Sequence, residues 1–466
     1  MWHSDAGPEG VSPGSVRGVV MGVHESGQRG LSSRGEPSAR RASSSTPGLV
    51  SWAFYDWASS AFATVIQTFV FAAYFTRHVA ENETVGSVQW GNTLSAAAIV
   101  VAIGGPILGA MVDQGGRRKP WIAGFTALCV GATALLWFVR PSLEYVWLAL
   151  LLVWLGTIGE EFAAIFYNAM LPNLTGPDRL GRWSGWGWSL GYAGGLASLV
   201  VALFAFVRAD HPWFSLDRAA AEHVRATFLL VAVWYLLFAI PLFLVTPDSR
   251  GTGKGLGRAA RDGLRQLSDS IREVRRYRDI IRFLIARMIY IDGLATVFAF
   301  GGVYAAGTFN MTAEEVLIFG IALNFTAGVG AALFAWVDDW IGSKLTILLS
   351  LVGLMVPATL ILLVQSPALF WAFGLLLGVF VGPVQAASRS FMARIAPEAL
   401  LNEMFGLYAL SGKATAFLGP LLVGWGTYLS GSQRFGMGTV IVFFVVGFFL
   451  MLTVPPDRKS GALGEL

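Results

Sequence analysis

Long apolar stretches alternate with short polar connections over most of this chain. A membrane-spanning helix needs about 20 predominantly apolar residues, and stretches of this kind recur about twelve times. The pattern therefore predicts an all-α polytopic membrane protein that crosses the lipid bilayer about twelve times, with little chain left for a soluble domain. We expect the spans at approximately residues 50–77, 88–112, 120–139, 145–171, 183–207, 225–246, 281–307, 315–337, 345–364, 368–393, 403–428 and 435–455.

The composition supports this class and removes several others. Of 466 residues, 55% are hydrophobic and only 13% are charged, which excludes a soluble protein with a polar surface. Cys129 is the single cysteine, so disulfides and the cysteine patterns of metal sites are not expected. The phosphate-binding loop Gly-x-x-x-x-Gly-Lys-Ser/Thr is also missing from the sequence. We therefore expect no cofactor, no metal and no nucleotide, and an ion gradient as the energy source.

Basic residues gather in the connections on one side of the predicted spans. That side holds the groups at 117–119, 179–182, 250–282 and 458–459, whereas the opposite connections hold scattered arginines. The positive-inside rule then predicts that both termini are cytoplasmic. Topology thus explains the net charge of +4, and no nucleic acid partner is expected. In a bacterial cell the membrane would be the plasma membrane; a vacuolar membrane is the alternative in other cells.

Two parts of the chain are predicted to lie outside the membrane or along its surface. Residues 1–46 are rich in Ser, Gly and Arg, which indicates a disordered tail. Between the sixth and seventh spans, apolar residues recur at helical spacing among arginines, which predicts an amphipathic basic helix along the cytoplasmic headgroups; a partner-binding helix is the alternative. The apolar positions of this helix are Leu256, Ala260, Leu264, Leu267, Ile271 and Val274.

These features predict five regions. They are a disordered cytoplasmic tail at 1–46, a six-helix bundle at 47–246, a cytoplasmic linker at 247–280, a second six-helix bundle at 281–455 and a cytoplasmic tail at 456–466. A weak internal repeat supports the two halves. The fourth and fifth spans have proline and glycine at positions that correspond to those of the tenth and eleventh. Repeated halves of this kind are typical of transporters that bind their substrate near the midplane.

The connection after the second span carries the sharpest local motif, with Gly109, Asp113, Gly116, Arg117 and Arg118. Gly109 permits close approach of a neighbouring helix. Asp113 lies at a helix end where it can pair with a basic group, and Gly116 permits a tight turn. A basic loop on the cytoplasmic side would explain the arginines alone, but not the glycines and the aspartate.

A decayed copy of this motif follows the eighth span, with Asp339, Gly342 and Lys344. The two copies resemble the gating motif of the major facilitator superfamily. Within it, the chain resembles the vacuole-effluxer branch, also called the unknown-major-facilitator family. Five segments in order carry this resemblance, with Ser59 in the first where the family more often has asparagine: 55–61, 167–172, 191–195, 385–390 and 405–413.

The resemblance implies a major facilitator fold of two pseudo-symmetric six-helix bundles over approximately residues 50–455. It also implies secondary transport, with amino-acid efflux described for vacuolar members. In this fold the first, fourth, seventh and tenth spans line a central cavity, and the third, sixth, ninth and twelfth face lipid. The predicted third, sixth, ninth and twelfth spans carry no charge inside the membrane. This agrees with lipid-facing positions, because a charged side chain in contact with lipid is costly. The charges within spans lie in the first, fourth, seventh, tenth and eleventh: Asp56, Glu160, Glu161, Arg287, Asp292, Arg389 and Lys413.

A buried carboxylate is the group that a proton-coupling site needs. We expect Glu160 or Glu161, together with Asp292, to carry the proton. Asp56 is a further candidate, although a structural pair with a basic residue such as Arg389 explains it equally well. Arg389 and Lys413 are expected to be counter-ions of these carboxylates or ligands of a substrate carboxylate. Arg287, near the cytoplasmic end of its span, is a further candidate cation and is expected to snorkel.

Neutral side chains in the same spans can bind a polar solute or wall the pocket. The sequence therefore predicts a monomeric secondary active transporter, not an enzyme, that exports a small polar solute such as an amino acid by proton-coupled alternating access. A transporter-like sensor without net transport is the alternative. The neutral cavity candidates are Tyr55, Gln67, Asn168, Tyr192, Asn324, Gln385 and Tyr408.

Overall fold

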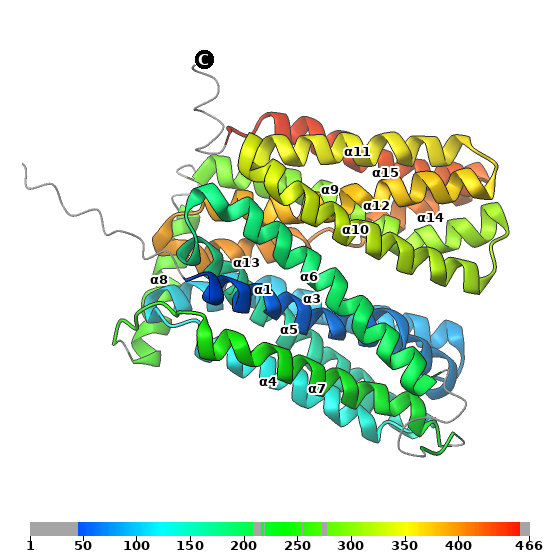
Figure 1. Cartoon of the computed structure of the whole chain (residues 1–466), viewed down its shortest axis with the longest axis horizontal. Helices are drawn as coiled ribbons and strands as arrows, with labels where there is room; N and C mark the ends of the chain where they lie inside the picture. Colours follow the sequence, from blue (N-terminus) through cyan, green and yellow to red (C-terminus); the bar gives the residue numbers. More distant parts are fainter. Residues whose placement is uncertain (1–44, 208–215, 219, 254, 273–276, 457–466) are drawn as a thin grey trace, which may run out of the picture. The chain divides into compact units, whose positions relative to one another are not determined.

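The computed structural model describes residues 45–207, 216–218, 220–253, 255–272 and 277–456. The predicted tails at 1–46 and 456–466 fall almost entirely outside these residues. Over the described ranges the chain is helical, and the long helices lie side by side with the linker helix at one end (Figure 1). Within the described residues, eleven helical segments are long and apolar enough to cross a membrane. The all-α polytopic class predicted from the sequence is confirmed.

The N-terminal half is built from one long interrupted helix followed by five more spanning segments. Its first segment, 46–79, includes two stretches of π-helix, of which the first, 62–69, contributes to the cavity described below. The elements are α1 (Thr46–Ala61), η1 (Phe62–Phe69), α2 (Phe71–Tyr74), η2 (Phe75–Val79), α3 (Glu83–Gly115), α4 (Lys119–Leu135), η3 (Leu136–Phe138), η4 (Leu143–Tyr145), α5 (Val146–Leu174), η5 (Pro177–Arg179), α6 (Leu180–Ala202), η6 (Leu203–Val207) and α7 (Glu222–Val245).

The C-terminal half follows the linker helix α8 (Leu256–Arg272). Its first long helices begin and end as the apolar pattern predicts, within a few residues. A capping box at Thr312 and Glu315 closes the N-terminus of the second of them. The elements are α9 (Arg278–Phe309), α10 (Ala313–Ile341), α11 (Ser343–Leu363), α12 (Pro367–Ile395), η9 (Glu398–Leu400), α13 (Leu401–Ser411), α14 (Leu418–Ser430) and α15 (Gln433–Leu452).

The eleventh predicted span is not one continuous helix, so the prediction was wrong on this point. Helix α13 ends at Ser411 and α14 begins at Leu418, with turns between them. Pro420 has no backbone N–H, so the carbonyl of Ala416 loses the donor that a continuous helix would supply. The break is short, and apolar residues continue on both sides of it, which is why the hydrophobic pattern alone did not reveal it.

The two halves meet along two seams, α6 against α10 and α3 against α13. Small residues allow both contacts. A Cβ built on Gly109 would lie 2.8 Å from the Glu403 backbone nitrogen, and one on Gly185 would lie 2.9 Å from the Ala335 Cα. Helices approach this closely only where no side chain intervenes. The seams pair the second segment with the eleventh and the fifth with the eighth, the arrangement expected of two pseudo-symmetric bundles.

Helix α8 forms within the predicted linker. It packs against α3 through the buried Ala259 and Gly263, while Leu264 is 51% exposed and lies next to the exposed Arg265. The placement of this helix along the cytoplasmic headgroups stays a prediction, and an exposed Leu264 agrees with it. Small residues form the contact with α3 because the two helices pack closely. Val274 lies outside the described residues.

Candidate functional site

A cavity of about 760 Å³ lies between the two halves. Its walls come from the middle of the first segment, the middle of α5, the later part of α6 and α9, and the earlier part of α10 and α12, with Arg389 from the end of α12. Successive segments run in opposite directions, so most of these parts lie between the middle of the bundles and one end. The gating motifs lie at the other end. Residues of α7, α11 and α15 also line the cavity, so the expectation that the sixth, ninth and twelfth spans face only lipid was wrong.

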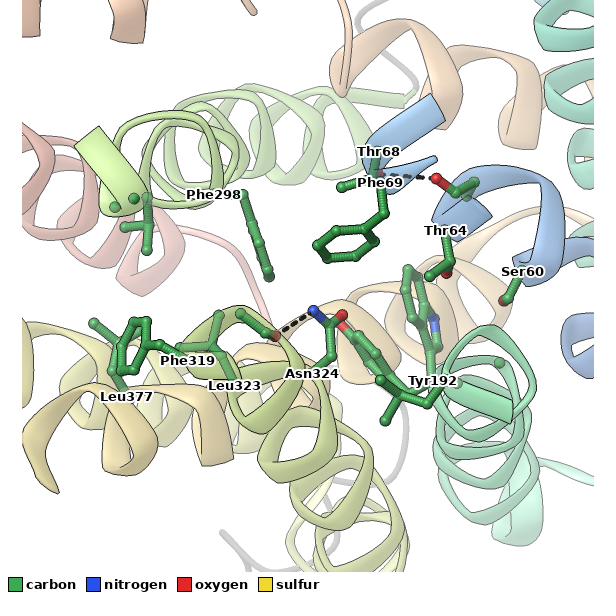
Figure 2. Close-up of a pocket in the computed structure, with 18 of the residues that line it drawn as sticks. Ser60, Thr64, Thr68, Phe69, Tyr192, Phe298, Phe319, Leu323, Asn324 and Leu377 are labelled. Atoms are coloured by element: carbon green, nitrogen blue, oxygen red, sulfur yellow. Dashed lines mark hydrogen bonds between the residues drawn. The ribbon is translucent and has the colours of Figure 1, made fainter. Parts of the chain in front are cut away.

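The wider part of the cavity is aromatic and apolar. Phe69 from the first half and Phe298 and Phe319 from the second point into the same space, with Tyr192 and Asn324 beside them (Figure 2). The Asn324 amide donates to the Gly320 carbonyl at 2.8 Å. The remaining labelled lining residues are Ser60, Thr64, Thr68, Leu323 and Leu377.

Two of the predicted neutral candidates act together at this wall. The Gln385 amide donates to the Tyr192 hydroxyl at 2.8 Å, so Gln385 orients a cavity residue without lining the cavity itself. Gln67 instead donates to Thr157 at 3.0 Å and is also not a lining residue.

The narrow end of the cavity contains the buried arginine of α12. Arg389 Nη1 contacts Asp56 Oδ2 at 2.9 Å and donates to Asn168 at 3.2 Å. Its other donors bind the hydroxyl and the carbonyl of Ser184 at 2.9 and 2.6 Å. Arg389 therefore ties four segments of both halves together. The geometry corresponds to the counter-ion interpretation, because these contacts occupy most of its donors.

Tyr55, another predicted cavity candidate, also lines the narrow end of the cavity. Its hydroxyl is 2.6 Å from Thr126 Oγ1 and 3.0 Å from the Tyr235 hydroxyl. All three are buried, so this network fixes the ring of Tyr55 rather than offering its hydroxyl to a solute. Tyr55 lines the cavity with its apolar ring.

The adjacent glutamates of α5 have different surroundings. Glu161 Oε1 lies 2.6 Å from Lys413 Nζ, which projects from the break between α13 and α14. Glu160 lines the cavity, as expected for neighbours about 100° apart around a helix. Among the residues that the structure describes, none forms a hydrogen bond or ion pair with Glu160. Of the two, Glu160 is the carboxylate available to a ligand in the cavity.

Arg287 and Tyr408, two further candidates, lie outside the cavity lining and bind each other. Arg287 is 8% exposed, donates to the Tyr408 carbonyl and to Ser411 Oγ at 2.7 Å each, and stacks 3.5 Å above the Tyr408 ring. The expectation that Arg287 snorkels to the headgroups was therefore wrong. The carbonyls exposed where α13 ends hold the guanidinium inside the bundle.

Asp292 also lies outside the cavity. It is 1% exposed, and no ion pair reaches it from any described residue. The four predicted carboxylates are thus divided among three environments. Asp56 and Glu160 line the cavity, Glu161 is paired across the bundles, and Asp292 is buried in the C-terminal half.

The first gating motif closes the α3–α13 seam. Asp113, at the end of α3, accepts hydrogen bonds from the backbone N–H groups of Asn402 and Glu403 at 3.1 and 2.9 Å. It thereby caps the N-terminus of α13, where the helix dipole favours a negative charge. Arg118 donates to the Asn402 side chain at 3.0 Å, while Arg117 is exposed. Asp113 therefore holds the C-terminal half against the N-terminal half.

The second copy repeats this arrangement with the halves exchanged. Asp339, at the end of α10, accepts from the backbone N–H of Gly181 at 2.9 Å, at the N-terminus of α6. Arg182 and Arg394 lie 3.6 and 3.3 Å from the same carboxylate. Lys344 caps the end of α15 by donating to the Leu452 carbonyl at 3.1 Å. The decayed sequence motif thus occupies a position equivalent to the first.

Both copies turn at a glycine with positive φ, 84° at Gly116 and 89° at Gly342. Side chains with a Cβ rarely adopt this conformation. A Cβ at Gly116 would in addition collide with the Arg250 carbonyl. These two glycines therefore set the sharp turns that place Asp113 and Asp339 at the seams.

Several residues of the site carried no sequence signal. Asn402, Glu403 and Gly181 contribute backbone N–H groups, which any residue type supplies. Ser184 and Phe298 are common residue types in apolar helices. Their roles depend on which helix ends meet in space, and only the preference for a small residue at a tight seam could have indicated Gly181.

Comparison with known proteins identifies two family models in this chain. The model described as "Vacuole effluxer Atg22 like" matches residues 178–462, and the model "Sugar (and other) transporter" matches residues 48–159. The uncharacterized MFS-type transporter YxiO of Bacillus subtilis is 28% identical over 88% of this chain and 95% of its own length. Autophagy-related protein 22-1 of Penicillium rubens is 25% identical over 59% of this chain and 49% of its own length.

Solved structures share the fold at low sequence identity. The outward conformation of the major facilitator transporter FucP has a TM-score of 0.68 at 14% identity, covering 88% of this chain and 99% of that chain. The proton:xylose symporter XylE has a TM-score of 0.64 at 15% identity, covering 90% and 98%. The major facilitator architecture expected from the gating motifs is confirmed.

Proposed function

The chain belongs to the vacuole effluxer Atg22-like family of major facilitator transporters, which are integral multi-pass membrane proteins and not enzymes, and from this premise we propose what it transports and how. The solute is a small amphipathic cation or zwitterion, such as an amino acid with an apolar side chain. A proton is exchanged for it, and the direction is export. Both termini face the cytoplasm in this proposal, in agreement with the distribution of basic residues.

The chemistry of the cavity supports this solute class. Phe69, Phe298 and Phe319 form an apolar wall, which suits an apolar or aromatic body. The narrow end carries the carboxylates of Glu160 and Asp56, which suit an ammonium group. A ligand with an apolar body and a cationic head would satisfy both ends. A sugar would leave the aromatic wall without apolar contacts along most of its surface.

The observation that carries the proposal is the free carboxylate of Glu160. The charges of Asp56 and Glu161 are balanced by direct ion pairs with Arg389 and Lys413, whereas Glu160 forms no such pair with any described residue and interacts with Lys413 only at longer range. An unpaired charge at membrane depth is costly, so Glu160 would bind either a proton or the solute's ammonium group. Because one carboxylate cannot hold both, protonation from outside would release the solute, which is the requirement of proton-driven export.

Alternating access is the movement that would connect the two sides. In this structure both gating motifs hold the two halves together at one end of the bundles. The cavity lies between the centre of the bundles and the other end. In the proposed cycle the seams at α3–α13 and α6–α10 open together when the bundles rock about the cavity. Solute would then enter from the cytoplasm and displace the proton from Glu160.

The test is proton flux in proteoliposomes that contain a pH-sensitive dye. We expect pooled amino acids to drive proton movement, and pooled sugars, nucleosides and organic acids to leave it at the background rate. Glu160→Gln keeps the shape of the side chain but cannot release a proton, so we expect it to abolish solute-driven proton flux.

The matched control is Glu144→Gln, the same chemical change at an exposed residue outside the cavity, which should retain normal flux. Undiminished solute-driven flux in Glu160→Gln would rule out this residue as the proton carrier. A response to sugars but not to amino acids would overturn the proposed solute class.

A further inference from the structure

Asp292 is a carboxylate that the proposed exchange at Glu160 does not use. It lies in α9, 1% exposed, and neither carboxylate oxygen has a hydrogen-bond donor in the described part of the protein. The Thr415 hydroxyl lies close to this carboxylate, and it too is buried without a partner in good hydrogen-bond geometry. Two oxygen groups whose hydrogen-bonding capacity is not filled therefore lie close together in the C-terminal bundle.

Nearby basic side chains do not explain this arrangement. Arg287, one turn earlier in α9, uses its Nη1 on the Tyr408 carbonyl and Ser411 Oγ. Lys413 reaches across to Glu161 at 2.6 Å. The hydroxyl of Thr296 is also engaged, because it donates to the backbone carbonyl of Asp292 at 2.6 Å. Asp292 is consequently a buried carboxyl group that pairs with no basic side chain of the described residues.

The break between α13 and α14 supplies the remaining features of a cation site. Thr415 lies in this break, and the carbonyls of Gly412 and Ala414 accept no hydrogen bond from any described residue. The C-terminal end of α13 adds its negative dipole. Gly419, at the start of α14, brings that helix close to α9, since a Cβ there would lie 3.2 Å from the Asp292 carbonyl oxygen. Unwound helices of this kind coordinate ions in other transporter folds.

From this geometry we propose that Asp292, Thr415 and carbonyls of the 412–417 break form a binding site for Na⁺. Carboxylate, hydroxyl and carbonyl oxygens are the hard ligands that such a cation prefers. The tight packing of α14 on α9 favours Na⁺ over the larger K⁺. The site is separate from the transport cavity and does not depend on the identity of the transported solute. Bound Na⁺ would hold the broken segment, and with it Lys413, in a fixed position.

Thermal unfolding of the purified full-length protein tests the site without any transport measurement. Na⁺ should raise the unfolding temperature in a saturable manner over K⁺ or choline at constant ionic strength, because a ligand that binds the folded state stabilises it. Asp292→Asn should abolish the Na⁺-specific shift. Thr415→Val should raise the apparent dissociation constant for Na⁺ by about tenfold, the effect of losing about 1.4 kcal/mol of binding energy.

Matched variants separate binding from a general loss of stability. Thr415→Ser keeps the hydroxyl and should keep the Na⁺ response. Thr346→Val removes a buried threonine hydroxyl in α11 and should respond as the unmodified protein does. The proposal is overturned if Na⁺ and K⁺ give equal unfolding temperatures in the unmodified protein, or if Thr415→Val and Asp292→Asn retain its Na⁺ response. Stabilisation by low pH alone, lost in Asp292→Asn, would assign the group to a proton and equally overturn the Na⁺ site.

Discussion

At the residue scale, two ion pairs at membrane depth cross the interface between the bundles. Asp56 pairs with Arg389, and Glu161 pairs with Lys413, each joining a helix of the N-terminal half to one of the C-terminal half. Removal of one partner from a buried pair leaves an uncompensated charge, which costs more than removal of both. The pairs therefore act on the packing of the two halves as well as on the cavity.

The Glu161–Lys413 contact provides a direct test of this cost. Glu161→Gln and Lys413→Met should each lower the unfolding temperature, and the double variant should lose less than the sum of the two. Both side chains are partly accessible, at 22% and 35% exposure, so we expect a coupling energy of only roughly 1 kcal/mol in a double-mutant cycle. Strict additivity would contradict a stabilising ion pair.

At the element scale, helix ends and close seams decide which conformation is stable. Asp113 caps α13, and Gly109 lets α3 approach close enough for this contact. The sequence motif identified Gly109 and Asp113, but not their partner, because the partner is the backbone of a helix almost 290 residues later. In the same way, the hydrophobic pattern predicted the position of the eleventh segment but not its break.

Gly109→Ala should force α3 and α13 apart and shift the population away from the conformation described here. Overpacking of this kind costs about 1–3 kcal/mol. We expect a cysteine at Ser60 in the cavity, introduced with Cys129 replaced by alanine, to react roughly tenfold more slowly with an impermeant thiol reagent added on the cavity side.

Gly115→Ala is the matched control, because a Cβ there meets no atom within 4 Å. This variant should label at the normal rate. Equal labelling of both variants would mean that the α3–α13 seam does not limit the conformational equilibrium.

At the scale of the whole molecule, two features could be predicted and two could not. Composition and span length predicted the polytopic fold, and the family resemblance implied that the first, fourth, seventh and tenth spans surround the cavity, although the sixth, ninth and twelfth also contribute to its lining. The pairing of Glu161 with Lys413, which leaves Glu160 available, required the rotation of α5 relative to α13. The isolation of Asp292 likewise depends on what is packed around it, which the position of a charge in a span does not reveal.

The two gating motifs are related by the exchange of halves, so a rigid-body movement should open both together. Amide hydrogen exchange can test this at sites remote from the substitution. Asp339→Asn removes the negative charge that strengthens the Gly181 contact and pairs with Arg182 and Arg394, yet it should also speed exchange at Asn402 and Glu403, whose N–H groups bind the unmodified Asp113. Asp113→Asn should conversely speed exchange at Gly181. If each substitution affected only its own seam, the gates would open independently, and a single rocking movement of two rigid bundles would be excluded.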